Sequence, residues 1–445
     1  MISLSAQEMA EAMGARIVAA GGDSRPERAV VDSREAGPGD LFFGLRGASA
    51  DGGEFAGQAL GAGAWGAVVG GEGDGLPGGW VFAVEDPLLA LGALARAWRR
   101  RLGAGVVGIT GSVGKTTVKD IAKALLPGRV HANQENLNTE IGLPLTVLAA
   151  PPETDVLVLE MAMRGAGQIA ELAEIAEPDV GVITNVGPVH VELLGSIEAI
   201  AAAKAELLAG LGPEGTAVVP ADPGPLAPHL DPSRRALTFG EGGDVAARGT
   251  TVEDGVTEAA VVTPAGDHVF HFPFTEAHNV TNALAAIAAG LALGADIGEM
   301  ADRAPDIGFS RFRGERVELP GGILLVNDCY NANPVSMRAA LDHLATLGAA
   351  RRIAVLGVMA ELGSEAPSYH REVGAHAREA GVDVVIGVGE PSRDYDPDQL
   401  VATPEDAAEL LAAQLGAEDA VLVKGSRSAG LEAVAEELEE LLADG

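Results

Sequence analysis

The sequence predicts an α/β protein of three domains: a small N-terminal α/β module, a central P-loop ATPase-like domain with a mostly parallel sheet, and a C-terminal Rossmann-like α/β domain. The 445 residues correspond to two or three domains at about 150 residues each. Hydrophobic residues make up 47% of the chain, enough for packed cores. Near-continuous apolar runs alternate with helical segments, as in parallel sheets covered on both faces. We expect the domains to span residues 1–85, 86–310 and 311–445.

The N-terminal block mixes short strand-like runs with glycine-rich turns, which indicates a small module. Its elements are expected in this order: a helix over 5–13, strands over 30–34 and 40–45, a helix over 55–62 and a strand over 63–70. A helix over 88–102 then leads into the central block.

The central block has the alternating strand and helix pattern of a parallel sheet. Strands are expected over the apolar runs 106–110, 155–160 and 180–186. The helices between and after them are expected over 118–126, 167–176 and 197–211. Residues 240–275 alternate polar and apolar positions and predict short antiparallel strands, and 283–295 predicts a buried helix.

The third block repeats the alternation of strands and helices. The expected strands are 322–328, 352–358, 382–388 and 419–425. The expected helices are 335–347, 370–380 and 404–415. The sequence contains no internal repeat and no low-complexity linker.

The composition excludes several classes of function. A net charge of -34 repels a nucleic-acid backbone, and 4% aromatic residues are too few for a base-stacking surface. The single cysteine, Cys329, excludes a disulfide framework and a Cys-rich zinc site. Apolar runs are shorter than the ~20 residues that span a bilayer, and the N-terminus lacks the basic flank of a signal peptide. We therefore expect a soluble, cytosolic monomer with no nucleic-acid or membrane partner.

The segment GITGSVGKTT, residues 108–117, has the pattern of a phosphate-binding loop, although Ile109 stands where the strict spacing has glycine. Its glycines let successive N–H groups turn toward one point, at which the following helix also aims its N-terminus. Lys115 is placed to bridge the outer phosphates and Thr116 to reach a magnesium ion. A chance Gly-Lys-Thr in a glycine-rich turn is the alternative. It is disfavoured because a preceding strand, a following helix and a rare lysine are all in place. The lysines of the chain are Lys115, Lys119, Lys123, Lys204 and Lys424. The expected nucleotide-binding residues of the loop are Gly111, Ser112, Val113, Gly114, Lys115, Thr116 and Thr117.

Three further residues are candidates for catalysis or metal binding. Glu160 ends the strand 155–160, at the edge where ligands gather in parallel sheets. His190 follows the strand 180–186, and Lys204 lies on an alanine-rich helix. Each also has an ordinary explanation: a strand-end acid, a solvated loop histidine and a snorkelling surface lysine.

Together these features resemble the Mur ligase family of ATP-dependent amide-forming enzymes, over essentially the whole chain. The similar segments of the N-terminal block are DSR (32–34), PGDLF (38–42), Gly47 and Asp51-Gly52. The later ones are NLNTEIGLPLTVL (136–148), TNVGPVHVELLGSIEAIAAAKAEL (184–207), DCYNANPVSM (328–337), VLGVMAELG (355–363) and VLVKGSR (421–427). The segment 328–337 is the most specific of these, because it is similar to the corresponding segment of family members that add D-alanyl-D-alanine.

The chain departs from the family pattern at five positions. Thr139, Val358, Asn327, Cys329 and Gly53 stand where Asn, Asp, Asp, Ser and His are usual. The departure at Val358 removes a carboxylate from the C-terminal domain. None of the five falls on the phosphate loop or on the three candidate residues.

The resemblance implies that ATP phosphorylates a carboxylate of UDP-N-acetylmuramoyl-tripeptide, and that D-alanyl-D-alanine then attacks the acyl phosphate to form an amide. It implies the catalytic residues Lys115, Glu160, His190 and Lys204. It also implies two magnesium ions, one held by Thr116 and Glu160 and one by His190 and a carbamylated Lys204.

Further binding residues follow from the same resemblance. Asn282 is expected near the adenine and Asp328 at the ribose, while Arg313 takes the place of a family arginine for which Arg316 is the competing alignment. The residues expected at the UDP-peptide substrate are Ser33, Arg34, Asp51, Asn136, Asn138, Asn331, Asn333, Lys424 and Arg427. Turn formation alone also explains the DSR segment and the two asparagines before Pro334.

Three other functions are compatible with parts of the sequence. Another Mur-type amide ligase, adding a single amino acid or acting outside peptidoglycan, is the main alternative, and segment 328–337 disfavours it. A nucleotide-binding regulator without turnover is disfavoured by Glu160, His190 and Lys204. A Rossmann dehydrogenase is disfavoured because GVGE (387–390) lacks the G-x-G-x-x-G pattern.

Overall fold

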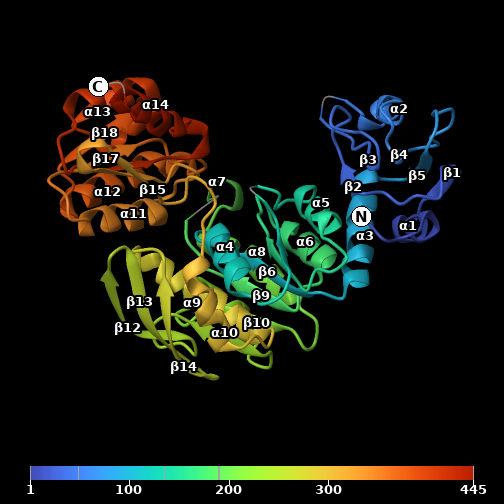
Figure 1. The fold of residues 1–445 in the computed structure, drawn as a ribbon, viewed down its shortest axis with the longest axis horizontal. Helices are drawn as coiled ribbons and strands as arrows, with labels where there is room; N and C mark the ends of the chain where they lie inside the picture. Colours follow the sequence, from blue (N-terminus) through green and yellow to red (C-terminus); the bar gives the residue numbers. More distant parts are fainter. Residues whose placement is uncertain (1, 49, 135, 189–190, 444–445) are drawn as a thin grey trace.

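The computed structural model describes every residue except 1, 49, 135, 189–190 and 444–445. Its elements form three groups that follow one another along the chain, from the blue N-terminal group through the green and yellow central group to the red C-terminal group (Figure 1). The predicted fold class is confirmed. No helix among the described residues is long and apolar enough to cross a membrane.

The first group is built on a five-stranded sheet in the order β1-β5-β4-β3-β2, in which only β1 runs antiparallel to its neighbour. Its elements are α1 (Ala6–Met13), β1 (Arg16–Ala19), β2 (Arg28–Val30), β3 (Asp40–Phe43), η1 (Gly52–Phe55), α2 (Ala56–Gly61), β4 (Gly66–Gly70) and β5 (Trp80–Val84). The strand predicted over 30–34 is wrong beyond Val30, because Asp32 accepts hydrogen bonds from the backbone and guanidinium of Arg34 and closes a turn.

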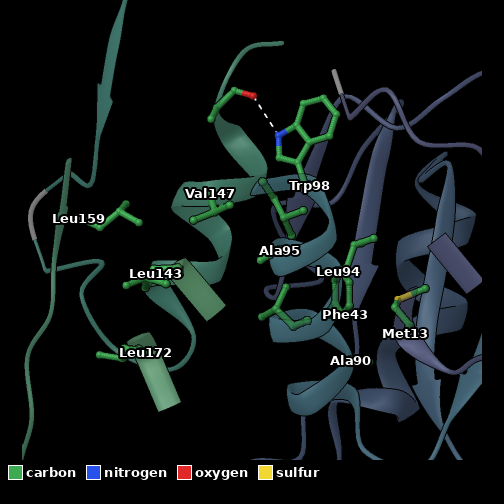
Figure 2. Close-up of a cluster of buried hydrophobic side chains, with 14 of the residues drawn as sticks. Met13, Phe43, Ala90, Leu94, Ala95, Trp98, Leu143, Val147, Leu159 and Leu172 are labelled. Atoms are coloured by element: carbon green, nitrogen blue, oxygen red, sulfur yellow. Dashed lines mark hydrogen bonds between the residues drawn. The ribbon is translucent and has the colours of Figure 1, made fainter. Parts of the chain in front are cut away.

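Helix α3 (Pro87–Leu102) joins the first group to the second and belongs to the core of both. One continuous cluster of buried side chains runs from Phe43 of the first sheet, through Leu94 and Trp98 of α3, to Leu143 and Leu159 of the central domain (Figure 2). The indole of Trp98 donates to the carbonyl of Ala150 at 3.2 Å. The predicted boundary at residue 85 therefore lies just before a shared helix.

The central sheet has six parallel strands in the order β11-β10-β9-β6-β8-β7. They are β6 (Gly105–Thr110), β7 (Val130–Ala132), β8 (Val156–Glu160), β9 (Val180–Ile183), β10 (Thr216–Pro220) and β11 (Ala236–Phe239). The helices around them are α4 (Lys115–Leu125), α5 (Gly142–Ala149), α6 (Gln168–Ala176), α7 (Val191–Leu194), α8 (Ile197–Ala209) and the 3₁₀ helix η2 (Gly224–His229). Successive β6 residues alternate between two cores: Val106 faces α3, α5 and α6, whereas Val107 and Ile109 face α4 and α9.

A small antiparallel sheet extends the central domain, as residues 240–275 predict. It consists of β12 (Ala246–Glu253), β13 (Val256–Thr263) and β14 (Gly266–Phe272). After it come α9 (Ala277–Ala292), α10 (Ile297–Arg303) and η3 (Ala304–Asp306). Phe270 and Phe272 pack into the same core as α4 and α9, which fixes this sheet on the central domain.

The C-terminal sheet has six strands in the order β15-β16-β20-β17-β18-β19, and only β15 is antiparallel. The strands are β15 (Glu315–Leu319), β16 (Ile323–Asn327), β17 (Arg352–Leu356), β18 (Val384–Val388), β19 (Gln399–Val401) and β20 (Ala420–Lys424). The helices are α11 (Pro334–Thr346), α12 (Ala366–Glu379), α13 (Pro404–Gln414) and α14 (Glu432–Ala443), with 3₁₀ turns η4 (Pro320–Gly322), η5 (Gly363–Glu365), η6 (Glu390–Tyr395) and η7 (Arg427–Ala429). Helices α11 and α12 cover one face, and α13 and α14 the other.

Candidate active site

The phosphate loop lies between the end of β6 and the start of α4, and two of its glycines are required by their surroundings. A Cβ on Gly111 would lie 1.8 Å from Oγ1 of Thr184, and one on Gly114 would lie 2.5 Å from Oδ1 of Asn282. Gly114 also has φ +83°, a conformation that side chains disfavour. The backbone can therefore approach its neighbours closely only because these positions carry no side chain.

Residues after β9 hold this loop in shape. The side chain of Asn185 accepts from the N–H of Val113 at 2.9 Å and donates to its carbonyl at 3.0 Å. Thr184 Oγ1 donates to the same carbonyl, and Ser112 Oγ exchanges hydrogen bonds with the backbone of Gly187. The side chain of Ser112 and the N–H of Val113 are thus used inside the protein. The N–H groups of Thr116 and Thr117 belong to the first turn of α4. This is the end of a helix at which anions bind.

Thr116 and Glu160 meet at the mouth of the loop. Thr116 Oγ1 donates to Glu160 Oε2 at 2.8 Å, and Asn138 Nδ2 donates to Oε1 at 2.9 Å. Glu160 is buried, with 4% of its surface exposed, and both of these partners are neutral. A buried carboxylate beside a hydroxyl is a set of hard oxygen donors, so these residues fit one magnesium ion shared with a phosphate.

Two buried lysines, Lys115 and Lys204, lie in the site. Lys115 folds back so that its Nζ donates to the carbonyl of Gly111 at 2.9 Å, and burial lowers its pKa against the opposing effect of Glu160. Lys204, on α8, has 2% of its surface exposed. Burial, and then the charge of Lys115, lower the pKa of Lys204 well below its usual value. The two amines therefore act on each other within one site, and Lys204 is not a surface lysine.

The other half of the predicted second metal site cannot be placed, since His190 lies outside the described residues. Among the residues that the structure does describe, no three or more His, Cys, Asp or Glu side chains are grouped to hold a metal.

The nucleotide residues expected from outside the loop come from two domains. Asn282, on α9, lies against Gly114 and donates to Asn279 Oδ1 at 3.1 Å. Arg313 reaches Thr116 Oγ1 with its Nη2 at 2.9 Å, whereas Arg316 donates to Thr275 at an exposed position. The geometry therefore favours Arg313 over the competing Arg316.

The predicted residues of the C-terminal domain form a cluster of their own. Lys424 is buried, and its Nζ lies 2.6 Å from Asp328 Oδ2 and donates to the carbonyl of Asn331 at 3.0 Å. Asn333 accepts hydrogen bonds from two N–H groups at the start of α11 and so caps that helix. Arg427 pairs with Glu432 at 3.0 Å. These contacts give each residue a structural role, and substrate contacts for Asn331, Asn333, Lys424 and Arg427 stay predictions.

The predicted residues of the N-terminal domain lie in turns after its strands. Ser33 and the exposed Arg34 follow β2, and Asp51 accepts from the N–H of Gly53 to start η1. Figure 1 shows β2 and β3 apart from α4. Asn136 is exposed.

Sequence reasoning missed Asn133, whose amide bonds both the backbone N–H and the carbonyl of Glu160 at 2.8 Å. It also missed Thr184 and Asn185, although the TNVGP stretch that contains them is part of a similar segment. Ser310, which donates to Asp120, carried no signal in the sequence.

Comparisons with known proteins find matches along nearly the whole chain. The Mur ligase middle domain matches residues 109–290, and the Mur ligase glutamate ligase domain matches residues 312–427. The UDP-N-acetylmuramoyl-tripeptide--D-alanyl-D-alanine ligase of Synechocystis is 40% identical and covers 94% of this chain and 92% of the relative. The ligase of that name in Escherichia coli is 34% identical over 99% of both chains.

Solved structures give the same result. MurF from Acinetobacter baumannii superposes with a TM-score of 0.88 and 28% identity over 98% of both chains. MurF ligase from Thermotoga maritima, in complex with ADP, gives a TM-score of 0.84 and 31% identity over 94% of this chain and 98% of that one.

Proposed function

The chain belongs to the Mur ligase family, and we propose that it joins D-alanyl-D-alanine to UDP-N-acetylmuramoyl-tripeptide in an ATP-dependent, ADP-forming reaction of peptidoglycan precursor synthesis. The observation that carries the proposal is the match over nearly the full chain, at 34% and 40% identity, to ligases named for this specificity. We place the reaction in the cytoplasm.

The reaction first brings two anions together, the tripeptide carboxylate and the triphosphate of ATP, and the amine reacts afterwards. The γ-phosphoryl group passes to the tripeptide carboxylate, and the resulting acyl phosphate is attacked by the amine of D-alanyl-D-alanine, releasing phosphate. Repulsion between the carboxylate and the triphosphate is the barrier that the site must lower. Lys115 and Arg313 bring fixed positive charge to the loop, and the N-terminus of α4 adds its N–H groups.

Thr116 and Glu160 are the residues that would hold a magnesium ion. When bound, the ion neutralises phosphate charge and acts as a Lewis acid on a phosphoryl oxygen. Asn138 orients the carboxylate of Glu160 through its hydrogen bond, and Asn133 fixes the backbone of the same residue. The carboxylate is thereby presented in one orientation.

We further propose that Lys204 carries a carbamate and, with His190, holds a second magnesium ion. A carbamate forms when a neutral amine bonds to CO₂ and loses a proton. The lowered pKa of Lys204 supports the proposal, because burial favours the neutral amine that this reaction needs.

The domain limits 1–85, 86–310 and 311–445 and the substrate residues Ser33, Arg34 and Asp51 belong to the same proposal. If the UDP group lies near these residues and the tripeptide carboxylate meets ATP at the phosphate loop, the UDP-peptide substrate spans two domains. The shared helix α3 supports a fixed distance between the two.

The test is a phosphate-release assay with ATP, magnesium, UDP-N-acetylmuramoyl-tripeptide and D-alanyl-D-alanine, each omitted in turn. We expect release only when all four are present. Replacing D-alanyl-D-alanine by single amino acids should abolish release. Release that ignores the two organic substrates would overturn the proposal.

A further inference from the structure

The segment between η3 and β15, residues 307–314, joins the central domain to the C-terminal domain and lies on α4. Ser310 donates to Asp120 Oδ2 from both its backbone N–H and its hydroxyl, each at 2.8 Å. Arg313 donates to Thr116 Oγ1 at 2.9 Å. Thr116 and Asp120 are four residues apart on α4 and therefore share one face of the helix. The linker is thus attached at two points, one of them at the phosphate loop.

Asp120 is a buried anchor rather than a surface acid. Its residue exposure is 8%, and its Oδ1 lies 3.2 Å from Nζ of Lys119, which is 3% exposed. Lys119 also donates to the carbonyl of Asn133 at 3.0 Å, and Asn133 holds Glu160. A buried carboxylate is tolerated only when it is paired and hydrogen-bonded. One continuous network therefore runs from the linker to the backbone of Glu160, the residue whose carboxylate belongs to the proposed magnesium site.

Arg313 has a hydrogen-bond donor that no described residue accepts from. Its guanidinium lies over the ring of Tyr330 in the C-terminal domain, 4.2 Å from the ring centre. Its Nε is buried and has no hydrogen-bond partner among the described residues. A buried guanidinium N–H beside a phosphate loop is suited to a phosphate oxygen. A shift of the linker would therefore move a phosphate-binding group.

We propose that Asp120 and Ser310 form a latch that positions Arg313 at the nucleotide phosphates, and that both are positioning residues for phosphoryl transfer. The inference rests on the ATP-dependent ligation proposed above. When the latch is broken, residues 307–314 are free to shift, and Arg313 follows Tyr330 away from Thr116. A linker tied down for stability alone would show no coupling to Arg313.

The test is a double-mutant cycle of Asp120→Asn and Arg313→Ala, with affinity for a fluorescent ADP in magnesium and kcat as readouts. We expect Asp120→Asn to lower both by about 10- to 100-fold, as misplaced catalytic groups do, with KM for D-alanyl-D-alanine unchanged. In the Arg313→Ala background the same change should cost less than about twofold, because the latch then has nothing to position. An equal loss in both backgrounds would overturn the latch.

Asp419→Asn is the matched control, because Asp419 is also buried and pairs with Arg351 at 2.6 Å within the C-terminal domain. It should lower the melting temperature without changing ADP affinity or kcat. If Asp120→Asn does not fold, Ser310→Ala enters the same cycle, with an expected loss of about threefold and the same criterion. A wild-type chain that does not ligate overturns the proposed function, whereas equal losses in a ligating chain overturn only the latch.

Discussion

Glu160 shows how single residues define this site. It is buried, yet the side-chain donors bonded to its two oxygens, Thr116 and Asn138, are neutral. Hydrogen bonds from neutral groups orient a carboxylate without cancelling its charge. The carboxylate oxygens are therefore held beside a loop built for anions, where a divalent cation can join the carboxylate to a phosphate.

Replacing Glu160 by glutamine tests this reading. The amide can keep one hydrogen bond to Thr116 or Asn138 but loses the charge, so we expect ligation to fall by at least about 100-fold, the scale of a lost metal ligand. Titration of a fluorescent ADP with and without magnesium gives the direct measurement. The wild-type affinity should rise with magnesium and that of Glu160→Gln should not. A magnesium effect of equal size in both proteins would contradict the assignment.

Lys204 gives the second prediction at this scale. Lys204→Ala should lose activity and regain part of it with added short-chain carboxylates, because these supply the oxygen ligands of the missing carbamate. Lys123→Ala, an exposed lysine of α4, is the control and should behave as wild type. Since a lowered pKa favours the neutral amine at neutral pH, ¹³C-bicarbonate should give a carbamate signal that Lys204→Ala lacks. Full activity of the variant without rescue would refute the carbamate.

Among the elements, α3 joins the first domain to the central domain. It is buried on two sides, since its side chains contact the first sheet and α5 and α6 of the central domain (Figure 2). Trp98 is 1% exposed within this cluster, while Leu89 on the same helix is 73% exposed. The first and central domains should therefore unfold together rather than as separate units.

Trp98→Ala should reduce the free energy of unfolding by about 3–5 kcal/mol, the usual effect of removing a buried tryptophan. Leu89→Ala should change it by less than about 0.5 kcal/mol, because that side chain is in solvent. Thermal unfolding followed by circular dichroism measures both. If Trp98→Ala split the transition in two, with only one part shifted, the core would not be shared.

How far the sequence predicts these elements depends on burial. Strands β6, β8, β9, β16, β17, β18 and β20 coincide with apolar runs, because nearly all of their residues are buried. The edge strands β1, β7, β11, β15 and β19 are half exposed and carry no such run, so they were not predicted. Strands β5 and β10 were also not predicted, although they are buried and as long as β8 and β17, so their sequences carried a comparable apolar signal.

The same limit applies to the site. The phosphate loop is contiguous and could be predicted as a motif. The bonds that hold it join Val113 to Asn185, 72 residues away, and Asp120 to Ser310, 190 residues away. Contacts at such separations are set by the order of strands in the sheet, which a single sequence does not specify.

At the scale of the whole molecule, the C-terminal domain is attached differently from the other two. Its described contacts with the central domain include polar ones: Arg313 with Thr116, and the buried pair of Glu276 and His343 at 3.3 Å. The first and central domains instead share an apolar core. Polar contacts between domains can be replaced by contacts with water or ligand, whereas separating an apolar core exposes hydrocarbon to water. We therefore expect substrate binding to move the C-terminal domain about residues 307–314 and to leave the other two as one body.

Small-angle scattering tests the closure, and spin labels identify the body that moves. Because the single native thiol, Cys329, is buried, labels can be attached at the exposed positions Asp74→Cys, Glu253→Cys and Glu409→Cys, one in each domain. With a non-hydrolysable ATP analogue plus UDP-N-acetylmuramoyl-tripeptide, the radius of gyration should fall. The distance from 253 to 409 should change, while that from 74 to 253 stays fixed by α3. An unchanged radius would count against closure, and a changed 74–253 distance would show that the shared core does not keep the first two domains together.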